Sequence, residues 1–143
     1  TTGCDLIVAG KHDWKLDLLN KQDIATIPIS QLPAVKFDSV IECSGVSSGF
    51  SLALSHVKPR GTMIVKSTYA GAFSFNPSQM VVDEITMIGS RCGLFSKAMA
   101  FLTKYKPDLT YLVSASIPIT DGLHAFETAQ QKDMMKVVIS MAE

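Results

Sequence analysis

The chain has 143 residues, a length typical of one domain, and 47% of them are hydrophobic, so we expect one compact unit with a single core. Thirteen basic residues balance thirteen acidic ones, which argues against nucleic acid or an anionic membrane surface as the main partner. No apolar run approaches the roughly 20 residues that span a bilayer and no secretion signal opens the chain, so we expect a soluble, cytoplasmic protein without membrane contact.

Cysteines and histidines form no metal-binding pattern. Cys4, Cys43 and Cys92 are odd in number, widely spaced and never in a C-x-x-C pair, so we expect reduced thiols in or near the core. The three histidines are scattered, and none has a Cys, Asp or Glu at a convincing metal-ligand spacing. The residues therefore predict no bound metal.

Apolar runs rich in β-branched residues alternate with stretches of helical period, which predicts an α/β fold with a mostly parallel sheet flanked by helices. In the first half, this pattern predicts strands over residues 4–9, 24–29, 37–43 and 62–66, and helices over 14–20, with Asp13 as N-cap, and 47–57. Between the second helix and the fourth strand, Lys58-Pro59-Arg60-Gly61 predicts a helix stop and a tight turn in which glycine takes a positive φ. In the second half, we expect a short helix from Pro77 to about Asp83, a strand over 85–89, a helix over 96–105, a brief strand over 117–119, a helix capped by Asp121, and a closing strand over 136–141.

Small, hydroxyl-bearing and basic residues follow several predicted strands. In open parallel sheets, ligands bind outside the carboxyl ends of the strands. Hydroxyls can bind ribose and amide groups, and cations can meet phosphate, so these turns predict a nucleotide-binding edge. The alternative is that they are the ordinary Gly- and Ser-rich turns of any α/β protein. The turns are Gly10-Lys11-His12, Cys43-Ser44-Gly45, Lys66-Ser67-Thr68 and Gly89-Ser90-Arg91.

Four successive segments, FDSVIECSG, VKPRGTMIVKST, VVDEITMIGSRCG and IPITDGLHAFETAQQKDMMKVVI, carry a family resemblance. In order and separation they resemble the C-terminal half of zinc-type alcohol dehydrogenases, members of the medium-chain dehydrogenase/reductase superfamily. The resemblance implies that residues 1–143 form part of an NAD(P)-binding Rossmann domain, with about 115–143 returning toward a catalytic domain. It also implies a truncated oxidoreductase that lacks the family's first strand, its G-x-G-x-x-G turn and the catalytic domain with its zinc ligands. We therefore expect no catalytic residue here and no dehydrogenase activity from the chain alone.

The resemblance favours NADP over NAD as the cofactor. Gly10 stands where family members that take NAD carry an acidic side chain for the ribose hydroxyls. Without that carboxylate a 2′-phosphate is not repelled, and Lys11, with His12 beside it, can pair with it. The alternative is that Lys11 and His12 are solvated turn residues.

The resemblance also implies roles for the later turns. The turn of Cys43, Ser44 and Gly45 corresponds to the one that passes the adenosine ribose, and Cys92 is expected to be a packed thiol rather than a nucleophile. Nicotinamide is expected at Ser67 and Thr68 with the backbone of Ile88, Gly89 and Ser90, and the pyrophosphate at Lys136, with Arg91 in the same role or in a subunit contact.

A missing first strand would leave a break in the sheet. In the usual order 3-2-1-4-5-6 that strand is central, so the 4–9 and 37–43 strands would be separated and each would expose an edge. Direct pairing, pairing with another copy, or a separate polypeptide carrying the missing half could each close the gap. Loss of the glycine turn also removes a pyrophosphate-binding helix N-terminus, so we expect weak or undetectable dinucleotide binding.

The strand over 85–89 lies at the other edge of the predicted sheet. Family members commonly pair this edge across a two-fold axis, and the apolar stretch 80–88 fits an interface, so we expect a homodimer. The alternative is an edge covered by its own flanking helix. The favoured function is the cofactor-binding part of an NAD(P)-dependent alcohol, polyol or sugar dehydrogenase; the alternatives are a non-catalytic nucleotide-binding module and a self-associating remnant.

Overall fold

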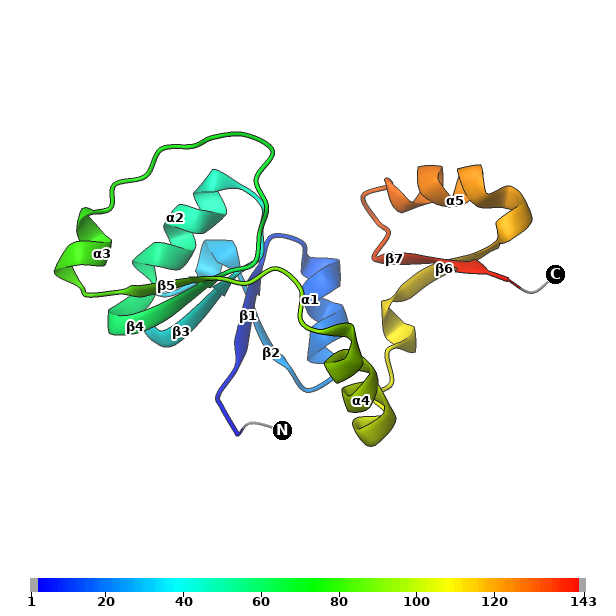
Figure 1. Cartoon of the computed structure of the whole chain (residues 1–143), viewed down its shortest axis with the longest axis horizontal. Coiled ribbons are helices and arrows are strands. Elements are labelled where there is room, and N and C mark those ends of the chain that lie inside the picture. Colours follow the sequence, from blue (N-terminus) through cyan, green and yellow to red (C-terminus); the bar gives the residue numbers. More distant parts are fainter. Residues whose placement is uncertain (1–2, 142–143) are drawn as a thin grey trace. The chain divides into compact units, whose positions relative to one another are not determined.

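The chain folds into two compact units, one up to Lys97 and one from Ala98 onward (Figure 1). The computed structural model describes residues 3–141. Every strand pair in it is parallel, so the predicted α/β class with parallel sheets flanked by helices is confirmed. The single unit predicted from chain length is wrong, because the strands form three separate sheets rather than one. No helix within residues 3–141 combines the length and the apolar character needed to cross a membrane.

The first sheet contains only β1 (Ile7–Gly10) and β2 (Ala25–Pro28), joined through α1 (Asp13–Asn20). The N-cap of α1 is His12, and its side chain makes no capping hydrogen bond. Asp13, predicted as the N-cap, lies instead in the first turn of the helix. A carboxylate there is favourable because it faces the positive end of the helix dipole.

The second sheet has the strand order β3-β4-β5. It contains β3 (Phe37–Glu42), β4 (Val57–Val65) and β5 (Thr86–Gly89). Because β1 and β3 belong to different sheets, the predicted break between the 4–9 and 37–43 strands is present, and the two strands do not pair directly.

The connection from α2 (Ser47–Ser55) into β4 differs from the prediction. The helix ends two residues early, because Val57 is fully buried and begins β4. Residues 58–61 belong to this strand rather than to a separate turn, and Arg60, not Gly61, takes the positive φ, at 62°.

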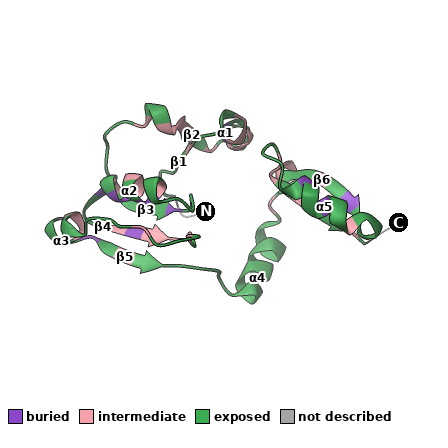
Figure 2. Cartoon of the chain, turned by 90° about the horizontal axis from the view of Figure 1, so that it is seen from above, coloured by how far each residue is buried: buried purple, intermediate pink, exposed green. Residues whose placement is uncertain are grey.

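The core of the first unit lies between α2 and the β3-β4-β5 sheet. Figure 2 shows buried positions in purple on β4, where Met63 is fully buried, and α2 contributes Phe50 and Leu54. Ile85, just before β5, completes this cluster with Val57. Burial of these five apolar side chains supplies the main hydrophobic stabilisation of the unit.

A long loop, residues 66–77, leaves β4, passes α2 and leads to α3 (Ser78–Val82), which Figure 1 draws in green. Its aromatic side chains pack on Phe50 of α2. Ring centroids lie 5.1 Å apart for Phe50 and Phe73, 4.9 Å for Phe50 and Phe75, and 4.7 Å for Tyr69 and Phe73. The cluster therefore ties the loop to the helix.

The second unit pairs β6 (Val113–Pro118) in parallel with β7 (Lys136–Ser140), with α5 (Gly122–Ala129) packed on both. Strand β6 begins four residues before the predicted 117–119 strand. Asp121 occupies the N-cap position of α5 as predicted, without a side-chain capping bond. Helix α4 (Phe95–Tyr105) crosses the division between the units, and short 3-10 helices cover Ile29–Gln31, Thr110–Leu112 and Ile119–Asp121.

Candidate functional site

Three of the predicted ligand-binding turns lie along one edge of the β3-β4-β5 sheet. The strands are parallel, so their carboxyl ends meet there. Backbone bonds lock the ends together, from Lys66 N to Glu42 O at 2.8 Å and from Ser90 N to Val65 O at 2.9 Å. We call the three turns that follow these strands, residues 43–45, 66–69 and 89–91, the strand-end rim.

A buried carboxylate, that of Glu42, organises the rim. Glu42 ends β3 and is only 2% exposed. Its Oε1 accepts hydrogen bonds of 2.6 Å from both the backbone N–H and the hydroxyl of Ser44, and its Oε2 accepts one of 2.6 Å from the hydroxyl of Tyr69. One side chain therefore bonds the turns that follow β3 and β4.

Hydrogen bonds keep this carboxylate ionised. Burial raises the pKa of Glu42, but the bonds donated by Ser44 and Tyr69 outweigh it, so the pKa lies below its ordinary value. Burial, the bond to Glu42 and the negative charge of Glu42 raise the pKa of Tyr69 to about 12. At neutral pH the pair is therefore a carboxylate and a protonated phenol.

The first and third turns of the rim present open backbone. Gly45 has a φ of +74°, a conformation that favours glycine, and a Cβ placed there would meet no atom within 4 Å. Its N–H donates a 2.8 Å bond to Ser67 Oγ, which joins the first two turns a second time. A Cβ at Gly89 would also meet nothing, so flat or branched ligand groups can approach the backbone at both glycines.

The Lys66 side chain forms hydrogen bonds with the third turn of the rim. Its Nζ donates to the backbone oxygens of Ser90 at 3.2 Å and Arg91 at 2.6 Å. The cation is solvent-exposed, so an anionic group at the rim would meet a positive charge held in place. Ile88, directly before this turn, is 47% exposed.

The remaining predicted residues lie outside the rim. Gly10 ends β1 in the two-stranded sheet, Lys11 and His12 follow it, and Lys136 begins β7 in the second unit. Gly10 has a packing role, because a Cβ there would come within 2.8 Å of Leu16 Cδ2 on α1. The ligand roles of all predicted residues, exposed Thr68 included, stay predictions.

The cysteines are not core residues. Cys4, Cys43 and Cys92 are all exposed and none forms a disulfide in the described part of the chain. The prediction of thiols in or near the core is wrong, as is the packed setting predicted for Cys92. Cys43 directly follows β3 and Cys92 lies three residues after β5, so both are in exposed segments at strand ends.

Three residues that organise the rim were not predicted as site residues. The signal for Glu42 was a charged residue directly after the apolar pair Val40-Ile41 at the end of a predicted strand, and Tyr69 follows the predicted Ser67-Thr68 pair. Gly49 in α2 gave no signal, because its importance comes from the Ser44 hydroxyl, which occupies the space that a Cβ at Gly49 would need.

A cavity of about 390 Å³ lies at the opposite, amino ends of β1 and β3. Both lysines that line it are already paired: Lys58 contacts Asp38 at 3.0 Å, an interaction that lowers the pKa of Asp38, and Lys36 contacts Asp83 at 3.2 Å. We therefore place the candidate site at the rim.

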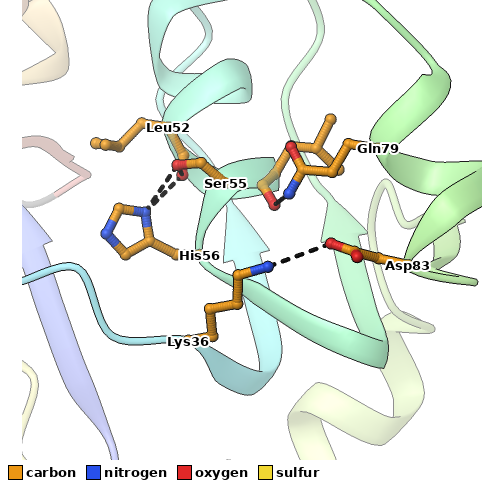
Figure 3. A network of polar contacts seen from close by, with 7 residues as sticks. Lys36, Leu52, Ser55, His56, Gln79 and Asp83 are labelled. Atoms are coloured by element: carbon orange, nitrogen blue, oxygen red, sulfur yellow. Dashed lines mark hydrogen bonds and ion pairs between the residues drawn. The ribbon is translucent and has the colours of Figure 1, made fainter.

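Close to this cavity, hydrogen bonds stabilise the C-terminal end of α2 (Figure 3). Nδ1 of His56 lies 2.8 Å from Leu52 O and 3.0 Å from Ser55 Oγ, while Gln79 donates to Leu54 O at 3.1 Å. These partners are backbone or neighbouring hydroxyl groups. We assign this network to local structure.

The described residues do not fit a zinc ion. Between residues 3 and 141 no group of three Cys, His, Asp or Glu side chains is placed to hold a metal. The rim does fit parts of a dinucleotide, since its hydroxyls, its cation and the open backbone at Gly45 and Gly89 match ribose, phosphate and planar rings.

The family model described as "Zinc-binding dehydrogenase" matches residues 1–104. D-arabinitol dehydrogenase 1 of Uromyces fabae is 26% identical over 107 residues, covering 72% of this chain and 31% of that protein. L-idonate 5-dehydrogenase from Escherichia coli K-12 aligns with a TM-score of 0.85 and 22% identity, over 96% of this chain and 43% of that chain.

Two further solved structures carry a coenzyme. A short chain alcohol dehydrogenase from Escherichia coli CFT073, complexed with NADH, has a TM-score of 0.83 and 15% identity over 96% of this chain and 44% of its own. A dehydrogenase from Sinorhizobium meliloti 1021, described as zinc-binding and bound to NADP, has a TM-score of 0.79 and 18% identity over 93% of this chain and 44% of its own. These structures share the Rossmann-like fold, and the chain spans less than half the length of each relative.

Proposed function

Because the chain belongs to the zinc-binding dehydrogenase family, we propose that it is the coenzyme-binding part of an NAD(P)-dependent dehydrogenase and that its strand-end rim receives the dinucleotide. In the full-length protein, hydride passes between the nicotinamide and an alcohol or carbonyl. The names of D-arabinitol dehydrogenase and L-idonate 5-dehydrogenase favour a polyol or sugar acid as the substrate class. The observation that carries the proposal is the joining of three polar turns at one parallel-sheet edge.

We assign the rim residues to parts of the coenzyme. The turn of Cys43, Ser44 and Gly45 passes the adenosine ribose, because it combines a hydroxyl with open backbone. The nicotinamide amide lies against Ser67, Thr68 and the backbone of residues 88–90. The pyrophosphate meets Arg91, which closes the third turn of the rim.

We propose NADP as the preferred coenzyme. Gly10 supplies no carboxylate at the end of β1, and Lys11 follows it directly. An ammonium group at that point attracts a 2′-phosphate. His12 lies beside Lys11 as the N-cap of α1 and adds to this attraction when protonated.

We predict that the 143-residue chain binds NADP weakly and more tightly than NAD. Saturation-transfer NMR with each coenzyme at equal concentration measures the difference. Lys11→Ala should lower NADP affinity about three- to tenfold while leaving NAD nearly unaffected. Lys21→Ala, which removes a cation at the far end of α1, is the matched control.

Micromolar NADP affinity in calorimetry would contradict the weak binding proposed here. No saturation transfer from either coenzyme would favour a remnant without ligand. Binding without alcohol-dependent NADPH formation fits an inactive coenzyme module, because the described residues hold no metal group that could polarise an alcohol.

We also propose a homodimer through the β5 edge. Among the described strands β5 pairs only with β4, and the neighbouring apolar side chains of Val81 and Val82 are 75% and 79% exposed. Solvent-exposed apolar groups beside a free strand edge favour association with a second copy.

We expect Val82→Glu to raise the dimer dissociation constant at least about tenfold, since it places two like charges in the interface. Sedimentation equilibrium measures the change. Leu123→Glu, at an 83% exposed position on α5, should leave the association unchanged. A chain that is monomeric at every concentration tested would rule out the dimer.

A further inference from the structure

Glu42 carries a buried negative charge without a cationic partner. No ion pair joins it to a lysine, arginine or histidine within residues 3–141, and its hydrogen bonds from Ser44 and Tyr69 come from neutral donors. Burying a charge costs free energy unless hydrogen bonds compensate for it. The hydrogen bonds that Ser44 and Tyr69 donate therefore stabilise the buried carboxylate, and the same bonds fix the positions of Ser44 and Tyr69.

The donors come from two segments that are far apart in the sequence. Ser44 belongs to the turn after β3, and Tyr69 belongs to the loop after β4. The Tyr69 ring also packs on Phe73, 4.7 Å between centroids, so the bond to Glu42 continues into the aromatic cluster on α2. The carboxylate therefore lies at the junction of the rim and the long loop.

Glu42 is not placed to bind a ligand itself. Its side chain is almost completely buried, Oε1 already accepts two bonds, and Oε2 accepts one. Glu42 and its partners instead orient other groups of the rim, including the N–H of Gly45, which donates to Ser67.

We propose that Glu42 is the positioning residue of the strand-end rim. Its ionised carboxylate couples the 43–45 turn to the 66–77 loop, so that each segment keeps a single conformation. The identity of the ligand they face rests on the proposed function. The coupling itself concerns this chain's own residues and can be measured without a ligand.

The test is amide hydrogen exchange of the full 143-residue chain, read residue by residue by NMR. Glu42→Gln keeps the shape, removes the charge and leaves one acceptor oxygen where the carboxylate has two. Weakening charge-assisted bonds to neutral ones should speed exchange at Ser44, at Gly45 and in loop residues 67–75 together, by about tenfold. Glu84→Gln, which neutralises a glutamate exposed on the surface, should change none of these rates.

Two further variants separate coupling from general destabilisation. Tyr69→Phe removes the phenol's bond to the carboxylate and leaves the contributions of Ser44 and Ser67, so it should speed exchange in the loop and at Gly45 but leave Ser44 protected. Gly49→Ala displaces the Ser44 hydroxyl without altering charge, and should loosen the 43–45 turn first. Both report on the coupling even if Glu42→Gln does not fold.

Unchanged exchange at Ser44 and in the loop of Glu42→Gln would overturn the proposal, as would loosening of one segment alone. In the variants that keep the charge, Tyr69→Phe without any effect on Gly45 would also overturn it. Hydrogen exchange of the parent chain in millimolar NADP tests the coenzyme assignment separately. If Glu42→Gln loosens both segments while NADP protects neither in the parent chain, the coenzyme assignment fails and the positioning role stands.

Discussion

Replacing Phe50 with alanine should lower the free energy of unfolding by about 3–5 kcal/mol, the range for removing a buried aromatic side chain. Phe50 is 4% exposed at the centre of the first unit's core. Its ring also contacts Phe73 and Phe75, so the substitution removes the surface on which the long loop packs. Urea unfolding followed by circular dichroism measures the change.

Phe126→Ala is the matched control, because the same side chain is 67% exposed on α5. It should alter stability by less than about 1 kcal/mol, as surface substitutions do. Similar losses in both variants would contradict the core described here. In Phe50→Ala the amides of loop residues 67–75 should also exchange faster than those of β4, since the loop loses its aromatic anchor while the sheet keeps its ladder.

Local patterns were sufficient to predict the turns that form the rim. Short β-branched segments such as 37–42 predict strands of a parallel sheet, and the polar residues directly after such strands must then lie at the carboxyl edge. The positions of Ser44, Gly45, Ser67 and Ser90 follow from this rule.

The groups that hold the rim together could not be predicted in the same way. Glu42 is a charged residue buried at the end of its strand, and its burial depends on donors 2 and 27 residues away. The space at Gly49 depends on a side-chain rotamer of Ser44. Cysteine exposure was mispredicted because composition reports how often a residue type is buried, not which turn it occupies.

Chain length also failed to predict the division near Lys97. A continuous sheet is what joins helices and strands into one layered core, and here β1–β2, β3–β5 and β6–β7 are separate. The break between β1 and β3 was expected from the resemblance, whereas the separate β6–β7 sheet was not. Pairing across sheets is a long-range property that local periodicity does not encode.

Gly61→Ala should destabilise the first unit by about 1–3 kcal/mol, the cost of forcing atoms into a packed site. A Cβ at Gly61 would lie 2.8 Å from the carbonyl oxygen of Lys58, 2.9 Å from that of Asp38 and 2.9 Å from a methyl group of Val57. Two of these neighbours are backbone atoms, which cannot rotate away as a flexible side chain could.

The cause is an irregularity in the β3–β4 ladder. Phe37 pairs with Val57 but Ser39 pairs with Thr62, so the residues between Val57 and Thr62 bulge out opposite a single residue of β3. Gly61 returns the chain to the ladder through a gap too narrow for a side chain. Glycine is needed at position 61 because neighbouring backbone atoms leave no room for a Cβ. The positive φ that the sequence predicted for Gly61 is found at Arg60 instead.

Gly71→Ala provides the comparison, because Gly71 lies in the long loop, has no positive φ, and would bring an added Cβ within 4 Å of no other atom. Thermal and urea unfolding of the two variants should therefore differ clearly, with Gly71→Ala close to the parent chain. Equal stability would mean that the 58–61 bulge relaxes freely. A loss confined to Gly61→Ala would establish that the bulge is fixed, and with it the register that brings Glu42 beside Val65 and sets the carboxyl ends of β3 and β4 level at the rim.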